Sequence, residues 1–198
     1  MRCLAYRGLI PSYSQGILLM ALFDFSIDKL ESYSPDEKAP PDFDAFWKRT
    51  LEPFTQAGGG GKAECVRLTD PFYKQVDVYD VSFKGYHGQP VKAWFIEPAG
   101  NKNPLPVFVS FIGYGGGRSL PVDHLLPLAA GFSNFVMDTR GQGSSWSPGD
   151  TGDDAPTGPQ YPGFMTRGIQ SKETYYYRRG FTDAFHAVQT AGELPHVD

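Results

Sequence analysis

The chain has 198 residues, of which 40% are hydrophobic and 15% aromatic, a composition typical of a globular domain with one core. Its net charge is −4, and its Lys and Arg residues are not clustered in the sequence, which excludes the electrostatic footprint of a protein that binds nucleic acid or anionic lipid. We therefore expect no nucleic-acid partner and no membrane association. Glycine (23) and proline (17) are abundant, which predicts many loops.

The two cysteines, Cys3 and Cys65, lie far apart in unrelated contexts. This spacing supports neither a disulfide framework nor a zinc site, so a reducing, cytoplasmic location is expected. The histidines show no H-E-x-x-H spacing, and no Asp/Glu/His cluster suggests a metal ligand set. We predict no metal and no cofactor.

An apolar run near the amino terminus, residues 17–23, follows Arg2 and Arg7 and imitates a secretory signal. The run is short and no small-residue cleavage site follows it. We therefore interpret residues 1–19 as an upstream extension and residues 20–198 as the folded domain.

An amphipathic helix is predicted after Asp42, a suitable N-cap, because apolar side chains recur at spacings of three and four. These side chains are Phe43, Phe46, Trp47, Leu51 and Phe54. Four glycines at 58–61 end this helix. From Ala63 to Pro98 the period changes to two, which predicts short antiparallel strands with a bulge near Val78. His87 falls in the turn at 84–89 and is expected to be exposed.

Residues 107–112 form an uninterrupted run of apolar or small side chains after Pro106, as expected for a central parallel strand covered on both faces. A short helix is predicted over 121–130 and a second parallel strand over 133–138. Together these segments predict a βαβ unit.

The predicted central strand ends in a glycine-rich loop, Gly113-Tyr114-Gly115-Gly116-Gly117. Such a loop can turn backbone N–H groups into a cleft. Three readings remain open: a dinucleotide-binding turn, which would need G-x-G-x-x-G running into a helix; an oxyanion-binding loop for acyl transfer; or an ordinary turn between a strand and a helix.

A second glycine-bearing loop, 138–145, follows the second parallel strand and should meet the first loop at the same sheet edge. A final helix is predicted from near Glu173, because apolar residues form one face. These residues are Tyr177, Phe181, Ala184, Val188 and Ala191. His186 lies off that face and is expected to be exposed.

Four segments in this order resemble the acetyl xylan esterase and cephalosporin-C deacetylase family of α/β-hydrolases. They are the helix beginning Asp42-Phe43-Asp44, the segment 113–118, Arg140-Gly141-Gln142-Gly143, and Tyr175-Tyr176-Tyr177-Arg178 with Asp183 after it. The resemblance implies an α/β-hydrolase fold in which the backbone N–H of Tyr114 is an oxyanion donor and contacts the substrate. Ile112 and Gly115 replace the histidine and asparagine that are usual in this loop of the family.

Members of this family continue for more than a hundred residues, through a Gly-x-Ser-Gln-Gly nucleophile elbow and then an acid and a histidine. No serine of this chain lies in G-x-S-x-G; Ser144 and Ser145 lie in a glycine loop and are interpreted as hydrogen-bonding loop residues. The chain is thus predicted to be the amino-terminal part of an α/β-hydrolase: a helix and an antiparallel meander leading into the first βαβ unit.

The implied function is removal of acetyl groups from acetylated sugars such as xylo-oligosaccharides, or from cephalosporin C, by a serine nucleophile. The alternative is a truncated product without esterase activity of its own. The resemblance also implies that the complete protein is a homo-oligomer.

Overall fold

The computed structural model describes residues 24–56, 62–155 and 163–198. The predicted extension at 1–19 and the glycine turn at 58–61 lie outside the described residues. The chain divides into two compact units, Met1–Pro41 and Asp42–Asp198. In the first, helix α1 (Ile27–Ser32) has no buried residue. The second unit holds the sheet and the core.

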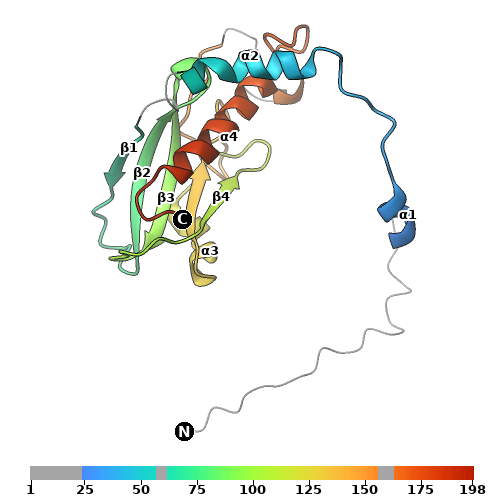
Figure 1. Cartoon of the computed structure of the whole chain (residues 1–198). Helices are drawn as coiled ribbons and strands as arrows, with labels where there is room; N and C mark the ends of the chain where they lie inside the picture. The colour runs from blue at the N-terminus through green and yellow to red at the C-terminus, as the bar shows by residue number, and fades with distance from the viewer. Residues whose placement is uncertain (1–23, 57–61, 156–162) are drawn as a thin grey trace. The chain divides into compact units, whose positions relative to one another are not determined.

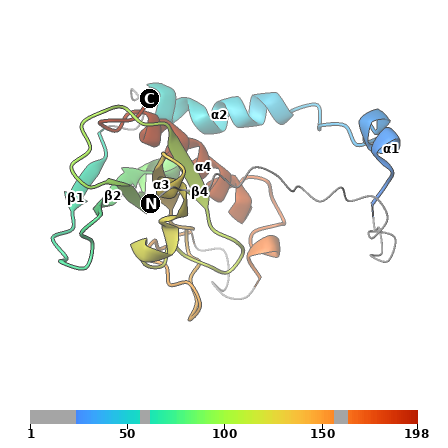
Figure 2. The same cartoon turned by 90° about the horizontal axis from the view of Figure 1, so that it is seen from below.

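A mixed sheet of five strands organises the second unit, in the order β1-β2-β3-β5-β4. The strands are β1 (Glu64–Arg67), β2 (Val76–Lys84), β3 (Pro90–Pro98), β4 (Val107–Phe111) and β5 (Ser133–Met137). Strands β1, β2 and β3 form an antiparallel meander, β5 pairs antiparallel with β3, and β4 pairs parallel with β5. This arrangement confirms the predicted meander and βαβ unit. Figures 1 and 2 show β1 and β4 at opposite ends of the sheet.

Short helical segments connect the strands, and one of the two longer helices, α4, covers the sheet. They are α2 (Phe43–Gln56), η2 (Tyr86–Gly88), η3 (Pro121–His124), α3 (Leu126–Ala129), η4 (Phe164–Thr166) and α4 (Tyr176–Gly192). The predicted helix over 121–130 is thus divided into η3 and α3. His87 lies exposed in η2, as expected.

The predicted bulge near Val78 is wrong, because β2 pairs with β3 in one continuous register from Val76↔Pro98 to Lys84↔Pro90. Both faces of this part of the sheet are covered. Val81 and Phe83 point to the core under α4, whereas Val78 and its partner Ile96 are buried on the opposite face. Because apolar side chains of β2 are buried on both faces, the alternation of apolar and polar residues shifts by one position along the strand. The sequence pattern alone indicated a bulge at this shift.

The core lies between the sheet and α4, which crosses the sheet in Figure 1. Ala187, Ala191 and Leu194 pack against buried side chains of β2, β3 and β5, namely Val81, Phe83, Val91, Ala93, Phe95, Phe135 and Met137. Helix α2 packs against the amino-terminal half of α4, where the rings of Trp47 and Phe181 lie 6.4 Å apart.

Helix α4 does not bury the face that its apolar spacing predicts. Phe181 and Val188 are 58% and 49% exposed, whereas the buried residues include Arg179, Asp183 and His186. The expected exposure of His186 is therefore wrong: it is 3% exposed, and its Nδ1 lies 3.0 Å from the carbonyl oxygen of Lys84. Burial lowers the pKa of His186.

Strand β4 lies at the edge of the sheet and not at its centre, which corrects the sequence prediction. Phe108 and Phe111 are 52% and 49% exposed there. The chain returns beside this strand after α4: the N–H of Leu105 donates to the carbonyl of His196 (2.9 Å), and the N–H of Asp198 donates to the carbonyl of Leu105 (3.0 Å). This is a parallel bridge between Leu105 and Val197.

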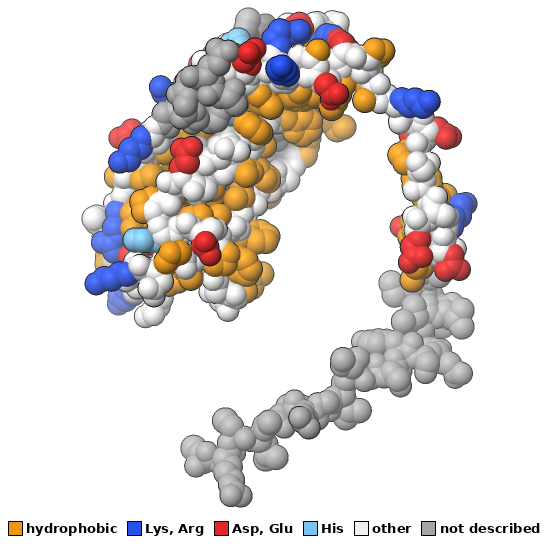
Figure 3. Space-filling model, in the orientation of Figure 1, with side chains coloured by type: hydrophobic (Ala, Val, Ile, Leu, Met, Phe, Trp, Pro, Cys, Tyr) orange, Lys and Arg blue, Asp and Glu red, His pale blue; other side chains and the backbone are white. Residues whose placement is uncertain are grey.

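Hydrophobic side chains gather over the region of α2, α4 and β4 in Figure 3. An exposed edge strand with apolar side chains is a template for pairing with another chain. We therefore predict that the chain self-associates with increasing concentration, and that Phe108→Lys weakens this association by about tenfold or more because a lysine on the edge opposes pairing.

Sedimentation velocity over a concentration series measures the effect. Phe72→Lys is the matched control, because Phe72 is 69% exposed in the connection between β1 and β2, away from β4. Equal association of the two variants would contradict a role of the β4 edge.

Candidate functional site

The glycine-rich loop after β4 presents one free backbone donor between residues 114 and 119. The other amides in this segment all have acceptors: Gly115 N–H donates to Gln142 Oε1 (2.6 Å), Gly116 to Gly113 O (3.0 Å), Gly117 to Ser147 O (2.8 Å), Arg118 to Asp138 Oδ1 (2.7 Å) and Ser119 to Pro148 O (2.8 Å). Among the described residues the N–H of Tyr114 has no acceptor. Gly115 has a φ of +84°, a conformation that only glycine adopts easily, so the turn that orients Tyr114 depends on it.

The side chain of Tyr114 holds its own segment in place. Its hydroxyl accepts hydrogen bonds from the N–H groups of Phe164 (3.1 Å) and Gly163 (3.4 Å), and its ring lies edge-on to Phe164 at 5.7 Å. Half of the tyrosine surface remains exposed. These contacts of the side chain anchor the backbone at Tyr114.

The loop after β5 packs directly on the loop after β4, as the sequence predicts. Asp138, which is fully buried, accepts from Arg118 N–H at 2.7 Å and from Asp150 N–H at 2.6 Å. A side chain at Gly117 would come within 2.1 Å of the backbone of Gly149, so the two loops can approach this closely only with glycine there.

The guanidinium group of Arg118 is buried and interacts with carboxylates and an aromatic ring of the same chain. It is 4% exposed, pairs with Asp80 (2.7 Å) and Asp150 (2.9 Å), and lies 3.8 Å above the ring of Trp94. The next helical segment, η3, begins at Pro121 and has four residues. A dinucleotide-binding turn needs a helix that starts directly from the loop, so this alternative is not supported.

A buried ionic network fixes the loop after β5 to α4. Arg140 donates to Asp183 through Nε (2.6 Å) and Nη2 (2.9 Å), and both side chains are fully buried. Arg179 and Arg167 pair with Asp153 at 2.8 and 3.1 Å, and Arg140 lies 3.8 Å from the same carboxylate. Burial alone would lower the pKa of Arg140, but the hydrogen bonds and charge of Asp183, with the charge of Asp153, outweigh it and raise the pKa.

A second short network connects the loop after β5 to the start of α4. Gln142 Nε2 donates to the hydroxyl of Tyr176 (2.8 Å), and that hydroxyl donates to the carbonyl of Arg140 (2.5 Å). Burial raises the pKa of Tyr176 to about 12, so its hydroxyl stays protonated in neutral solution. Tyr176 begins α4, and its own N–H donates to the carbonyl of Arg167.

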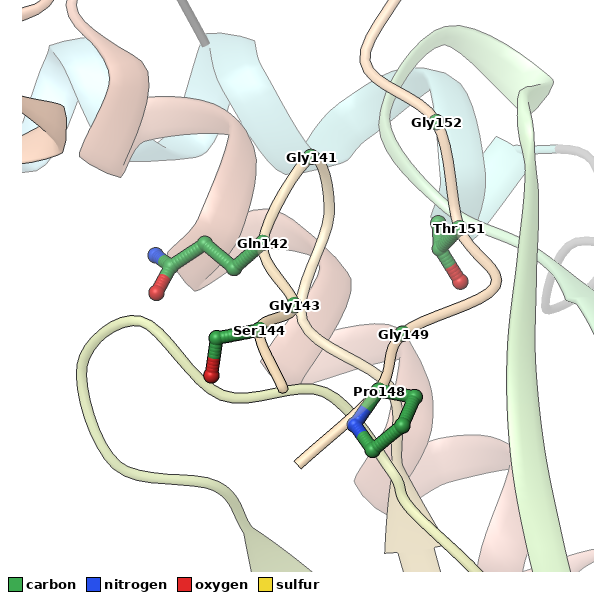
Figure 4. A pocket seen from close by; sticks show the side chains of 8 residues that line it. All are labelled: Gly141, Gln142, Gly143, Ser144, Pro148, Gly149, Thr151 and Gly152. Atoms are coloured by element: carbon green, nitrogen blue, oxygen red, sulfur yellow. The ribbon is translucent and has the colours of Figure 1, made fainter. Parts of the chain in front are cut away.

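A pocket of about 430 Å³ lies along the loop after β5. It is lined by Gly141, Gln142, Gly143, Ser144, Pro148, Gly149, Thr151 and Gly152, and Figure 4 shows the Gln142 side chain directed away from Gly149 and Gly152. Tyr114 is not among the lining residues, so this pocket and the free N–H are separate features.

Ser144 and Ser145 do not have the surroundings of a nucleophile. Ser144 Oγ is buried and has no hydrogen-bond partner within the described part of the chain, so no base activates it there. Ser144 takes part in the hydrogen bonds of the loop through its backbone, because its N–H donates to the carbonyl of Ser147 and its carbonyl accepts from the N–H of Ser147. Ser145 is exposed.

Across residues 24–56, 62–155 and 163–198, no group of three or more His, Cys, Asp or Glu side chains could hold a metal ion. In the same residues, every helix is too short or too polar to cross a lipid bilayer.

A model of the acetyl xylan esterase family (AXE1) matches residues 20–198. The chain belongs to this family. It is similar to the solved acetyl xylan esterase from Paenibacillus sp. R4, with 30% identity and a TM-score of 0.74 over 88% of this chain and 54% of that one. It is also similar to acetyl xylan esterase 1 from Thermoanaerobacterium sp. JW/SL YS485, with 28% identity and a TM-score of 0.72 over 89% of this chain and 53% of that one. The chain thus spans about half the length of these solved esterases.

The family assignment agrees with the resemblance found in the sequence, and the structure adds contacts that the sequence did not reveal. Arg140 and Asp183 were noted as parts of separate motifs, but their pairing was not predicted. Gln142 and Tyr176 were likewise noted without a role. One feature of the sequence indicates such pairing: charged and amide side chains occur in glycine-rich or aromatic segments. If such a side chain is buried, it needs a hydrogen-bonding partner.

The buried position of Arg140 predicts a large loss of stability when it is removed. Arg140→Met leaves the Asp183 carboxylate buried without its cation, which should lower the free energy of unfolding by about 3–5 kcal/mol in urea titrations. Arg49→Met is the control, because the Arg49–Glu173 pair is exposed and should contribute about 1 kcal/mol or less. Similar losses in both variants would show that burial of the Arg140 pair is unimportant.

Proposed function

We propose that this acetyl xylan esterase-family chain carries one part of the active site of a carboxylic ester hydrolase. The substrates would be acetyl esters of sugars such as xylo-oligosaccharides, or cephalosporin C. The observation that carries the proposal is the free N–H of Tyr114, which is followed by five residues, Gly115 to Ser119, whose amides all have acceptors. A rigid donor of this kind stabilises the negative charge that develops on a carbonyl oxygen during acyl transfer.

In the proposed reaction, a serine hydroxyl attacks the acetyl carbonyl carbon while a histidine, oriented by a carboxylate, takes its proton. The carbonyl oxygen becomes an oxyanion that accepts a hydrogen bond from the Tyr114 N–H. Collapse of the intermediate releases the sugar alcohol, which takes the proton from the histidine. Water then attacks the acetyl-serine by the same steps, and acetate leaves.

The serine would follow a strand paired with β4, and the carboxylate and the histidine would come from polypeptide after it. The parallel bridge between Leu105 and Val197 supports this placement, because polypeptide that continued this pairing would run parallel to β4 along its open side. The exposed Phe108, Phe111 and Phe181 would be covered by the added structure.

The alternative is a truncated product without catalytic activity. It is favoured by the absence of a G-x-S-x-G elbow from the sequence and of a base beside Ser144 in the described residues. Sequencing of genomic DNA and transcripts beyond the codon for Asp198 separates the two hypotheses. A frame that continues into a Gly-x-Ser-Gln-Gly elbow supports the esterase, and a stop codon in all transcripts supports the truncated product.

In a longer, active form of the protein that contains the nucleophile, removal of the Tyr114 N–H should lower kcat. Replacement of the Tyr114 amide by a backbone ester removes this donor alone, and kcat should fall by about a hundredfold to a thousandfold. Tyr114→Phe is the matched control: it keeps the N–H and loses only the hydroxyl that accepts from Phe164, so its effect should be mild. Near-normal turnover of the backbone ester would remove Tyr114 from the mechanism.

The 198-residue chain alone should not turn over p-nitrophenyl acetate above a weak background. Loss of a complete serine triad typically leaves no more than about a thousandfold to ten-thousandfold acceleration over water. Turnover that phenylmethylsulfonyl fluoride blocks would place a nucleophile inside this chain. In that event the double variant Ser144→Ala/Ser145→Ala tests whether the loop serines supply it.

We further propose that the complete protein is a cytoplasmic homo-oligomer that takes small acetylated substrates. The motive is the length of the connection between β5 and α4, because a long connection in a compact domain often has a functional or assembly role. Light scattering of the complete protein at micromolar concentration should give a mass of several chains, and a monomer would count against this proposal.

A further inference from the structure

We infer that Gln142 is a positioning residue that determines which backbone N–H of the loop after β4 is free. Its Oε1 accepts from Gly115 N–H at 2.6 Å, and this occupies the amide next to Tyr114. The inference deepens the proposed function, because it assumes that the Tyr114 N–H is the useful donor.

The orientation of the Gln142 side-chain amide follows from its neighbours. The Tyr176 hydroxyl has one hydrogen, which it donates to the Arg140 carbonyl at 2.5 Å. It can then only accept from Gln142, so the group 2.8 Å away must be the Nε2 donor and the opposite end must be Oε1. Because the pKa of Tyr176 is about 12, this order holds throughout neutral and mildly alkaline solution.

Gln142 itself has little freedom to turn. It is 7% exposed, and Tyr176 is 1% exposed at the start of α4. The loop that carries Gln142 is fixed to the same helix by the Arg140–Asp183 pair. Rigid support of this kind is what a side chain needs in order to hold a second group in place.

The loop after β4 needs such support because glycines surround Tyr114. Gly113, Gly115, Gly116 and Gly117 allow many backbone conformations at small energetic cost. If Gly115 N–H lost its acceptor, a polar group in a partly enclosed turn would be left unsatisfied, and a change in the backbone torsion angles of the turn would relieve it. Because Tyr114 lies between flexible glycines, that change would shift Tyr114 together with its N–H. The contact to Gln142 therefore selects one loop conformation.

The experiment measures hydrogen exchange of single backbone amides in the complete 198-residue chain by NMR. In the unmodified chain, Gly115 N–H should exchange at least about tenfold more slowly than Tyr114 N–H after correction for intrinsic rates. Gln142→Met keeps the length of the side chain but has no amide acceptor, and it should speed exchange at Gly115 by about tenfold or more. The amides of β5 should change by less than about twofold, because the sheet does not depend on this contact.

Two further variants keep the test specific. Tyr176→Phe removes the hydroxyl that orients Gln142 and should also speed exchange at Gly115, by less than Gln142→Met does. Gln75→Met is the matched control, because Gln75 is exposed before β2, and it should change neither Gly115 nor β5.

Unchanged exchange at Gly115 in Gln142→Met would overturn the proposal. So would equal acceleration of Gly115 and the β5 amides in both Gln142→Met and Tyr176→Phe, because Gln142 would then support the whole fold rather than the loop. Free exchange at Gly115 in the unmodified chain would also overturn it.

The catalytic consequence is measured separately, in the longer product that the proposed function predicts. There Gln142→Met should lower kcat by about tenfold to a hundredfold with KM unchanged, because a displaced donor weakens stabilisation of the transition state alone. If that product is inactive without substitutions, the proposed function fails while the exchange data still decide the role of Gln142. If it is active and Gln142→Met leaves kcat unchanged, the positioning role fails while the proposed function stands.

Discussion

The ion pair between Arg140 and Asp183 is the interaction on which the arrangement of the site depends. The Asp183 carboxylate also accepts from Tyr86 N–H (2.8 Å), and a side chain at Gly85 would lie 2.2 Å from it. The turn between β2 and β3, the loop after β5 and helix α4 therefore meet at one buried carboxylate. A charge so completely removed from water is tolerated only with several hydrogen bonds, so these three segments must be in place together.

The interior beneath α4 therefore has two parts, one apolar and one formed by buried ion pairs and hydrogen bonds. Under the carboxyl-terminal half of α4, apolar side chains pack on the sheet, where substitutions of similar volume cost little. Under its amino-terminal half, Arg140, Asp153 and Arg179 are held by directed hydrogen bonds. Such networks permit few alternative arrangements, and the loops that flank Tyr114 are attached to this polar half.

The sequence predicts the structure correctly where the local pattern of residues along the chain determines the secondary structure. The meander and the βαβ unit follow from periodic apolar residues and glycine-rich turns, and the structure confirms them. The sequence was a poor guide where the partner is distant, as for Arg140 and Asp183, which are 43 residues apart. The buried face of α4 was misjudged for the same reason, because ion pairing buries Asp183 and Arg179 while Phe181 remains exposed. The position of β4 at an edge depends on which strands pair with it, and apolar content alone does not specify this.

The edge position of β4 and the free N–H of Tyr114 are geometrically linked. Tyr114 follows the carboxyl end of β4, and β5 already occupies the other side of that strand. The bridge between Leu105 and Val197 is parallel and lies just before β4 begins, so polypeptide that continues this pairing runs toward Tyr114. The carboxyl ends of parallel strands meet at one edge of the sheet, which is where α/β proteins assemble their ligand sites. A loop that follows such a strand would thus emerge beside the Tyr114 N–H, which is the arrangement that the proposed function requires.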